Sequence, residues 1–439
     1  MLKEIFDEDL LIGIFGFGVT GRAVAKWCDK HNIRKRLFDD NVKECDPFSE
    51  EKIAECDVIV RSPSFLDENR WVRFVREQNI PCITELDLAA EFWKGRIIAV
   101  TGTDGKTTTT EFLACALQCV GYQAVAVGNN GRSLLEYTDD AINVPSNFAV
   151  IEISSFQASA LSKLHPDYVI WTNFAPDHIN VHGSLENYFA AKYNLTRLCH
   201  NPDTEHIFIG TSVAEYAKKN LSFSLLQDSN VHTVIKHLPV DSALNISVQR
   251  ENYALVEALW KVLQLPFQLL EKAALSFKLP EHRLQRVAAI KKTSKGDCVE
   301  FWDDSKATNF HSFQAALHSF DKKIILIAGG RSKGEDMDQY VDEICRNASS
   351  VLLMGETGEQ IYSEILLRKF EKFFNLLRYY GGSRENAEKI ILKIVNDAFC
   401  VALPGDVVLL SPGFASFDMF TSFNERGDLY KKCILKLNF

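Results

Sequence analysis

The sequence predicts an α/β protein built from three consecutive domains, and three observations support this prediction. The chain has 439 residues, which is enough for about three domains of roughly 150 residues each. Short apolar runs alternate with amphipathic segments along most of the chain, as in βαβ units with parallel sheets. Glycine-rich turns at 16–21 and 102–105 each follow such a run and precede a helix-like segment. We place the domains at 1–93, 94–280 and 281–439.

The first domain is predicted from three strand-like runs joined by polar or amphipathic segments. The runs LLIGIF, RKRLFDD and CDVIVRSP read as strands, and RAVAKWCDKH between the first two reads as a helix. The polar segment AAEFWKGR, at 89–96, marks the end of this domain.

The other two domains repeat the same alternation. In the central domain we expect strands at RIIAV, FAVIEIS, DYVIWTNF and HIFIG, a less regular stretch at about 204–250, and a helix at NYALVEALWKVLQL. The segment LPEHRL, at 279–284, marks the second boundary. In the last domain the expected strands are CVEFWDDS, KIILIAGG, SVLLMG and DVVLLSP. Parallel sheets with helices on their faces follow from this order.

Bulk properties exclude several classes of protein. The formal net charge is 49 − 58 = −9, which argues against a general nucleic-acid or membrane-surface binder. No apolar run reaches about 18 residues, and the acidic start MLKEIFDEDL lacks a signal core. Eleven cysteines without a C-x-x-C pair are typical of a reducing compartment. We expect a cytoplasmic protein with neither a membrane nor a nucleic-acid partner.

The turn TGTDGKTTT predicts a phosphate site. Gly102, Gly105 and Lys106 resemble a P-loop, although Val100 stands where its first glycine belongs. Small residues allow backbone N–H groups to converge on an anion at a helix N-terminus. Lys106 is expected to reach the phosphates, and Thr107 or Thr108 to ligate Mg²⁺. The alternative is a plain glycine turn with an exposed lysine, in which Asp104 is a turn residue.

The turn GFGVTG predicts a second phosphate site in the first domain. Gly16, Gly18 and Gly21 form G-x-G-x-x-G, and Asp39 and Asp40 follow at about the spacing of a ribose-binding acid. This pattern fits a dinucleotide-dependent dehydrogenase, any bound nucleoside diphosphate, or a tight turn without a ligand.

Polar residues at strand ends supply candidate metal ligands. Glu152 ends the run FAVIE, and His178 follows the run DYVIWTNF. A carboxylate and an imidazole beside a phosphate loop suit Mg²⁺. Lys192 lies in the apolar setting FAAKYNL, where a lysine normally extends its charged end to solvent. Asp177 and His182 fit solvated loop positions equally well.

Seven motifs in fixed order resemble the Mur ligases of peptidoglycan synthesis, and within them the D-glutamate-adding enzymes. They are TGTDGKTTT, EISSFQ, DHINVHGSLENYFAAK, HR at 282–283, DDSKATN, AGGRSKG and LLSPGFASFDMFTSFNERG. DSKATN and SP-x-x-ASFD are the specific ones. The resemblance implies Rossmann-like first and last domains around a P-loop-type ATPase domain, and a last domain that swings in to assemble the site.

The resemblance implies an ATP-dependent amide ligase that works through an acyl phosphate. The substrates would be UDP-N-acetylmuramoyl-L-alanine, D-glutamate and ATP with Mg²⁺, handled by a cytoplasmic monomer. Lys106, Glu152, His178 and a carbamylated Lys192 match catalytic positions. The ATP-binding positions would be Gly102, Thr103, Asp104, Gly105, Lys106, Thr107, Thr108, Asn252, Arg283 and Asp304. The metal positions would be Thr107, Glu152, His178 and Lys192.

The two remaining substrates are assigned in the same way. The UDP substrate would meet Gly18, Val19, Thr20, Asp39, Asp40, Ser62, Asn129 and Gln157. D-Glutamate would meet Lys306, Thr308, Lys333, Ser416 and Phe423. Two lysines near a dianion give the charge balance that glutamate requires.

The chain departs from the family pattern at four places. Ser64 follows Ser62–Pro63 where a glycine is usual, and Val248–Gln249 stand where His-Asn is usual. Gln285 and Ser332 each replace an acid, the second beside Lys333. The open alternatives are a ligase for L-lysine or diaminopimelate, a folate-polyglutamating enzyme, a dehydrogenase, and a nucleotide-gated binding module without turnover.

Overall fold

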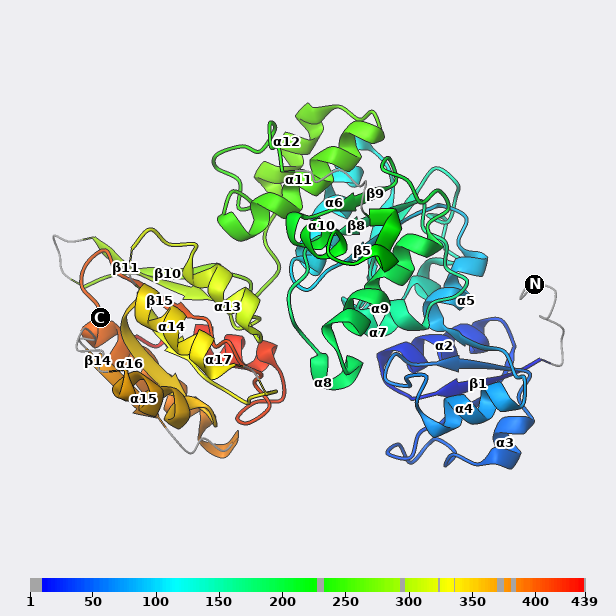
Figure 1. Cartoon of the computed structure of the whole chain (residues 1–439), viewed down its shortest axis with the longest axis horizontal. Helices are drawn as coiled ribbons and strands as arrows, with labels where there is room; N and C mark the ends of the chain where they lie inside the picture. The colour runs from blue at the N-terminus through cyan, green and yellow to red at the C-terminus, as the bar shows by residue number, and fades with distance from the viewer. Residues whose placement is uncertain are drawn as a thin grey trace. The chain divides into compact units, whose positions relative to one another are not determined.

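The computed structural model describes residues 10–226, 233–292, 297–322, 324–334, 336–368, 375–379 and 384–437. It divides into two compact units. One holds the chain to Asn245 together with Gln249–Phe277, and the other holds Ile246–Val248 and Lys278–Phe439. The first two predicted domains lie in one unit except for residues 246–248 and 278–280, which belong to the other unit together with the last predicted domain (Figure 1).

A four-stranded parallel sheet begins the first unit, in the order β2-β1-β3-β4. Its strands are β1 (Leu11–Phe15), β2 (Arg34–Phe38), β3 (Val58–Arg61) and β4 (Cys82–Thr84). The helices around it are α2 (Val19–Lys30), α3 (Glu50–Ala54), α4 (Arg70–Glu77) and α5 (Glu85–Phe92). β1 and β3 are buried along their whole length, which explains their continuous apolar sequences.

A five-stranded parallel sheet forms the centre of the first unit, in the order β6-β7-β5-β8-β9. Its strands are β5 (Arg96–Thr101), β6 (Ala124–Gly128), β7 (Phe148–Glu152), β8 (Tyr168–Trp171) and β9 (Ile207–Ile209). β5 lies between β7 and β8, so the turn after β5 is flanked by the ends of both neighbours. This edge of a parallel sheet is where ligands bind in α/β proteins.

Helices cover the central sheet and complete the first unit (Figure 1). The α-helices are α6 (Lys106–Val120), α7 (Ser155–Ala160), α8 (Ile179–His182), α9 (Leu185–Leu198), α10 (Thr211–Ala217), α11 (Ser247–Val262) and α12 (Phe267–Ser276). The 3₁₀ segments are η1 (Leu134–Tyr137) and η2 (Leu221–Leu226). α6 begins at Lys106, directly after the second glycine turn.

The two sheets of the first unit share one hydrophobic core. Val24 and Trp27 of α2 belong to the same buried cluster as Val127 and Ile151 of the central sheet. Polar contacts reinforce this junction, because Trp27 Nε1 donates to Thr138 Oγ1 at 3.2 Å. The buried Asp87 adds another contact, since its Oδ1 accepts the backbone N–H groups of residues 162–164 at 2.7–3.1 Å.

The second unit contains a six-stranded sheet in the order β10-β11-β15-β12-β13-β14. Its strands are β10 (Gln285–Lys291), β11 (Cys298–Asp303), β12 (Ile324–Ala328), β13 (Ala348–Met354), β14 (Asn375–Tyr379) and β15 (Val407–Leu410), of which β10 is antiparallel to its neighbour. The helices are α13 (Phe310–Leu317), α14 (Met337–Asn347), α15 (Gly358–Leu367), α16 (Ala387–Val401) and α17 (Phe423–Leu435), with η3 at Arg384–Asn386.

Alternate strand residues of the second unit face two separate cores. Ile325 and Ile327 pack with residues of α16 and α17, whereas Leu326 packs with residues of α13, α14 and α15. The sheet is therefore sandwiched between two helical layers (Figure 1). The predicted α/β class with mainly parallel sheets is confirmed.

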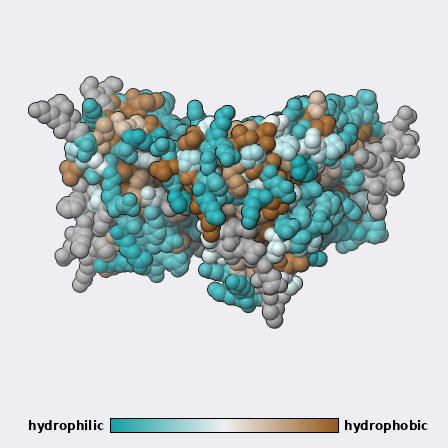
Figure 2. Space-filling view, turned by 90° about the horizontal axis from the view of Figure 1, so that it is seen from above, coloured by the Kyte–Doolittle hydropathy of each residue, from teal (hydrophilic) through white to brown (hydrophobic). Residues whose placement is uncertain are grey.

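The surface carries mostly hydrophilic side chains with hydrophobic residues scattered among them, as the face in Figure 2 shows. Among the described residues, no helix is long and apolar enough to cross a membrane. All eleven cysteines lie in the described part and are free thiols.

Candidate active site

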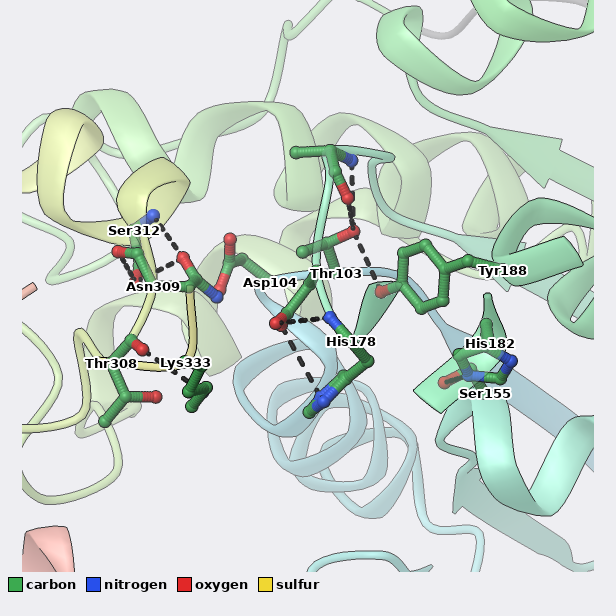
Figure 3. Close-up of polar contacts among 12 residues, drawn as sticks. Thr103, Asp104, Ser155, His178, His182, Tyr188, Thr308, Asn309, Ser312 and Lys333 are labelled. Carbon is green, nitrogen blue, oxygen red and sulfur yellow. Dashed lines mark hydrogen bonds and ion pairs between the residues drawn. The ribbon is translucent and has the colours of Figure 1, made fainter. Parts of the chain in front are cut away.

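The turn after β5 is held in shape by the residues that follow β8. Thr172 Oγ1 donates to Asp104 O at 2.6 Å, and Asn173 Oδ1 accepts from Asp104 N at 2.9 Å. Thr103 is fixed separately: its Oγ1 donates to Ala175 O and lies 3.2 Å from the Tyr188 hydroxyl (Figure 3). These contacts within the protein fix the conformation of the loop.

Gly105 is required at the start of α6 for two reasons. Its φ is +79°, in the left-handed region. A Cβ at this position would lie 2.4 Å from Asn252 Nδ2, so the Asn252 amide packs directly against the phosphate loop. Asn252 Nδ2 also donates to Gln249 Oε1 at 3.1 Å. Gln249, where the family pattern has another residue, therefore orients the predicted nucleotide contact.

Two lysines converge on one carbonyl of the loop. Lys106 Nζ donates to Gly102 O at 3.0 Å and to Thr103 O at 2.7 Å. Lys192 Nζ, from α9, donates to Gly102 O at 2.7 Å. Lys192 is only 1% exposed, so it does not extend its charged end to solvent. Burial, and then the charge of Lys106, hold the pKa of Lys192 well below its usual value.

Glu152, at the end of the neighbouring strand β7, has one carboxylate oxygen that could bind a ligand. The residue ends β7 and is 2% exposed. Its Oε1 accepts from Asn129 Nδ2 at 2.9 Å, whereas its buried Oε2 has no hydrogen-bond partner among the described residues. The buried Thr108 Oγ1 likewise has none. A buried carboxylate oxygen without a donor is costly unless a cation or a ligand completes it.

The histidines lie on the segment between β8 and α9. His178 adopts φ +54° at the start of α8, and its Nε2 lies 3.6 Å from Asp177 Oδ2 (Figure 3). His182 Nε2 lies 3.0 Å from Ser155 Oγ, and its ring stacks on Phe156. Burial, and then His178 and Lys192, lower the pKa of His182. His182 is therefore held by contacts within the unit, not left as a solvated loop residue.

Gln157 and Asn129 make contacts within the protein. Gln157 Oε1 accepts from the N–H and the hydroxyl of Ser154, both at 2.9 Å, in a capping box that begins α7. Asn129 is bound to Glu152 by its side chain and its backbone. Their predicted contacts to the sugar and peptide of the substrate stay predictions.

A separate open pocket of about 580 Å³ lies at the first glycine turn. Asp39 accepts from Phe17 N at 2.9 Å and from Asn41 N at 2.9 Å, and Asp40 accepts from Phe48 N at 3.3 Å. Both aspartates thus shape the pocket wall. The pocket is lined by Gly16, Gly18, Val19, Thr20, Asp39, Asp40, Asn41, Phe48, Ser62, Pro63, Ser64, Phe65, Asn69 and Trp71. Six of the eight predicted UDP-substrate residues line this pocket.

The predicted ATP contacts of the second unit lie around the start of β10 and the end of β11. Asp304 is 8% exposed and accepts from Leu284 N and Ser411 Oγ, both at 3.0 Å. Burial raises the pKa of Asp304 to about 8. Arg283 is half-buried and adjoins His282, whose Nδ1 lies 2.6 Å from Asp303 Oδ2.

The predicted D-glutamate residues all lie in the second unit, where Lys306 contacts Phe423 and Lys333 contacts Thr308. Lys306 Nζ lies 4.0 Å from the centre of the Phe423 ring. Lys333 Nζ donates to Thr308 O at 3.3 Å, so this lysine keeps a contact although Ser332 replaces the usual acid (Figure 3). Ser416 is buried.

Three residues that the sequence analysis did not identify support the predicted site residues: Thr172 and Asn173 at the phosphate loop, and Arg426 in the second unit. Thr172 and Asn173 fall inside the predicted strand DYVIWTNF, but the observed β8 ends at Trp171, so both lie in the turn after a central strand, where polar residues were the available signal. Arg426, fully buried on α17, donates to Ser305 O at 2.8 Å and to Phe414 O at 3.2 Å. It thereby ties the segment of Lys306 to that of Ser416. Arg426 lies in the motif LLSPGFASFDMFTSFNERG, but the motif alone did not indicate this buried structural role.

Comparison with protein families gives two matches. Residues 100–270 match the family described as Mur ligase middle domain. Residues 282–414 match the family described as Mur ligase, glutamate ligase domain. The first match includes the phosphate loop, and the second includes the DSKATN motif.

Relatives match over most of the chain. The UDP-N-acetylmuramoylalanine--D-glutamate ligase of Koribacter versatilis is 31% identical over 409 residues, covering 88% of this chain and 85% of the relative. The protein of the same name from Caldicellulosiruptor saccharolyticus is 29% identical and covers 99% and 100%.

Solved structures share the fold. The MurF ligase of Thermotoga maritima, in complex with ADP, matches with a TM-score of 0.57 at 14% identity, covering 100% of this chain and 98% of that one. The UDP-N-acetylmuramate-alanine ligase MurC of the same organism matches with a TM-score of 0.55 at 16% identity, covering 97% and 98%. With both family matches and relatives at 31% identity over most of its length, the chain belongs to the Mur ligase family.

Proposed function

We propose that the chain is an ATP-dependent ligase that joins D-glutamate to UDP-N-acetylmuramoyl-L-alanine in cytoplasmic peptidoglycan precursor synthesis. The main support for phosphate chemistry at this loop is that Lys106 and Lys192 both donate to Gly102 O. The choice of substrates is supported by the names of the relatives and by the DSKATN motif. None of these relatives is named as a dehydrogenase, and we drop that alternative.

The first step transfers the γ-phosphate of ATP to the carboxylate of UDP-N-acetylmuramoyl-L-alanine. A carboxylate oxygen attacks phosphorus, the bond to the β-phosphate oxygen breaks, and ADP leaves. Attack of one anion on another needs nearby positive charge. In the proposal, Lys106 exchanges its loop carbonyls for phosphate oxygens, and the N–H groups at the start of α6 bind the same anion. Thr103, Asp104, Asn252, Arg283 and Asp304 hold the nucleotide.

The residues fit a bound Mg²⁺. Glu152 Oε2 is a buried carboxylate oxygen without a hydrogen-bond partner among the described residues. Thr107 and His178, which match other metal positions, are proposed to add an oxygen and a nitrogen ligand. Mg²⁺, when bound, neutralises charge on the transferred phosphoryl group. Glu152 is held for this task by its hydrogen bond from Asn129.

Lys192 is proposed to become a carbamate. Its lowered pKa favours the neutral amine, which is the form that attacks CO₂. The nitrogen of the neutral amine forms a bond to the carbon of CO₂ and releases a proton, so the buried amine becomes an anion that suits a metal or the γ-phosphate environment.

The second step joins D-glutamate to the activated acid. The amine of D-glutamate attacks the acyl-phosphate carbon, a proton is lost from nitrogen, and inorganic phosphate leaves. Lys306 and Lys333 are proposed to bind the two carboxylates, and Thr308, Ser416 and Phe423 to complete that site. The nucleoside diphosphate is assigned to the pocket at Gly18, Val19 and Thr20.

Turnover with a panel of amino acids tests the proposal. The full-length protein is incubated with ATP, Mg²⁺, UDP-N-acetylmuramoyl-L-alanine and, in turn, D-glutamate, L-glutamate, L-lysine or diaminopimelate. We expect phosphate release and a ligated product with D-glutamate alone. Activity with L-lysine or diaminopimelate instead would refute the specificity, and binding without turnover would favour the nucleotide-gated module.

A further inference from the structure

Arg61 is a buried cation beside the first pocket, with no role in the reaction described above. It ends β3 and is 4% exposed. Its Nη1 donates to Phe65 O at 3.0 Å and to Asp67 Oδ1 at 2.7 Å. Its buried Nε has no hydrogen-bond partner among the described residues. Burying a charged guanidinium group is unfavourable, which points to a structural role for the two contacts that Arg61 makes with the loop 62–67.

Asp67 joins this loop to the next helix as well. Its Oδ2 lies 2.6 Å from Arg76 Nη2 of α4. Although burial raises the pKa of Asp67, hydrogen bonds from Arg76 and Arg61 together hold it below its ordinary value. Asp67 is therefore an anion between two arginines, and the loop is attached to both β3 and α4.

The loop 62–67 forms one wall of the pocket and contacts the opposite wall directly. Ser62, Pro63, Ser64 and Phe65 line the pocket. Ser62 Oγ donates to Gly16 O at 3.2 Å. A Cβ at Gly16 would lie 3.0 Å from the Phe65 ring. The position of Phe65 thus sets the gap between this loop and the glycine turn.

We propose that Arg61 and Asp67 are positioning residues for the nucleoside diphosphate of the UDP substrate. By holding Phe65 O, Arg61 keeps the loop 62–67 at a fixed distance from the turn 16–18, so that the pocket is formed before the ligand enters. Preorganisation of this kind raises affinity by lowering the ordering cost of binding. The inference rests on the assignment of this pocket to the UDP substrate.

The test compares Arg61→Met, Arg61→Lys and Asp67→Asn with the parent protein. Calorimetry measures the Kd of UDP itself, and steady-state kinetics measure kcat and the KM of each substrate. We expect Arg61→Met to weaken UDP binding at least tenfold and to raise the KM of the UDP substrate similarly, with kcat and the KM of ATP within twofold. Arg61→Lys should recover most of the affinity, because a single nitrogen makes both contacts.

Arg73→Met is the matched control, because Arg73 is exposed on the neighbouring helix α4; it should bind UDP like the parent. If Arg61→Met does not fold, Asp67→Asn decides, with an expected severalfold loss of UDP affinity. Arg61→Met with parental Kd, or Arg61→Lys as weak as Arg61→Met, would overturn the proposal. A parent that binds UDP but forms no ligated product would instead contradict the proposed function and leave the positioning result intact.

Discussion

At the scale of single residues, Lys192 shows what sequence reasoning settles and what it leaves open. From composition alone, the motif FAAKYNL favoured a lysine with its charged end in solvent over a functional one, and this preference was wrong. The structure buries it and directs its Nζ to Gly102 O. This partner is 90 residues away in the chain, so the contact depends on the tertiary fold that brings α9 to the turn after β5 and not on any local pattern.

Replacing Lys192 by arginine tests its proposed chemistry. Lys192→Arg places a cation that cannot form the carbamate, and we expect kcat to fall at least about a hundredfold, the scale of losing one transition-state electrostatic contact. Incubation of the parent with ¹³C-bicarbonate should give a carbamate NMR signal that the variant lacks. A variant as active as the parent, or a parent without the signal, would contradict the carbamate proposal.

Glu152→Gln tests the proposed metal position. The amide oxygen can still accept from Asn129, but the negative charge is lost, so we expect kcat to fall at least about a hundredfold and the Mg²⁺ requirement to rise. Initial rates over a range of Mg²⁺ concentrations measure both effects. Glu215→Gln, an exposed change on α10, is the control. Parental kinetics in Glu152→Gln would remove the carboxylate from the mechanism.

At the scale of elements, the strands missed by sequence reasoning are all at sheet edges. β4, β6, β10 and β14 each end a sheet. Strands buried on both faces, such as β5 and β12, have continuous apolar sequences and were predicted. β10 is only partly buried, and none of its residues is fully enclosed. β10 forms a strand because it pairs with β11. Pairing between two separate segments cannot be predicted from the local sequence of one of them.

The start of α5 offers a test of pH dependence. Burial raises the pKa of Glu85 from 4.5 to about 7, and Ser133 Oγ and Glu85 Oε1 are hydrogen-bonded. The folded state favours the protonated acid. The contribution of Glu85 to the free energy of unfolding is therefore fully present below about pH 4.5 and is lost as the pH rises to about 7. Glu85→Gln should therefore gain stability relative to the parent by up to about 3 kcal/mol between pH 4.5 and 8.

Urea unfolding of the parent and Glu85→Gln at pH 5 and pH 8 measures this difference. Glu77→Gln, an exposed change on α4, should show no such pH dependence. An equal difference between parent and Glu85→Gln at the two pH values would contradict the assignment.

Asp87 tests the junction between α5 and the central sheet. Asp87→Ala leaves three backbone N–H groups, those of residues 162–164, without their acceptor, and we expect a loss of at least about 3 kcal/mol in the free energy of unfolding. Asp87→Asn retains an acceptor oxygen and should lose less. Urea unfolding at one pH measures both variants, and a loss below about 1 kcal/mol in Asp87→Ala would show that the contacts are dispensable.

At the scale of the whole molecule, the alternation of strands and helices was sufficient to predict an α/β chain with mainly parallel sheets. The motif order predicted which sheet edges carry the phosphate loop and the glycine turn of the first pocket. The sequence did not reveal that the first two sheets share one core, because the shared contacts join α2 to residues more than 100 positions away. Nor did it reveal the supporting residues Thr172, Asn173 and Arg426.

Chemical activation of an acid by ATP is the central claim, and it predicts the fate of one oxygen atom. UDP-N-acetylmuramoyl-L-alanine labelled with ¹⁸O in its alanine carboxylate is turned over with ATP, Mg²⁺ and D-glutamate, and the inorganic phosphate is analysed by mass spectrometry. Formation of an acyl phosphate requires one labelled oxygen in each phosphate released. Phosphate without the label, formed alongside ligated product, would contradict the account.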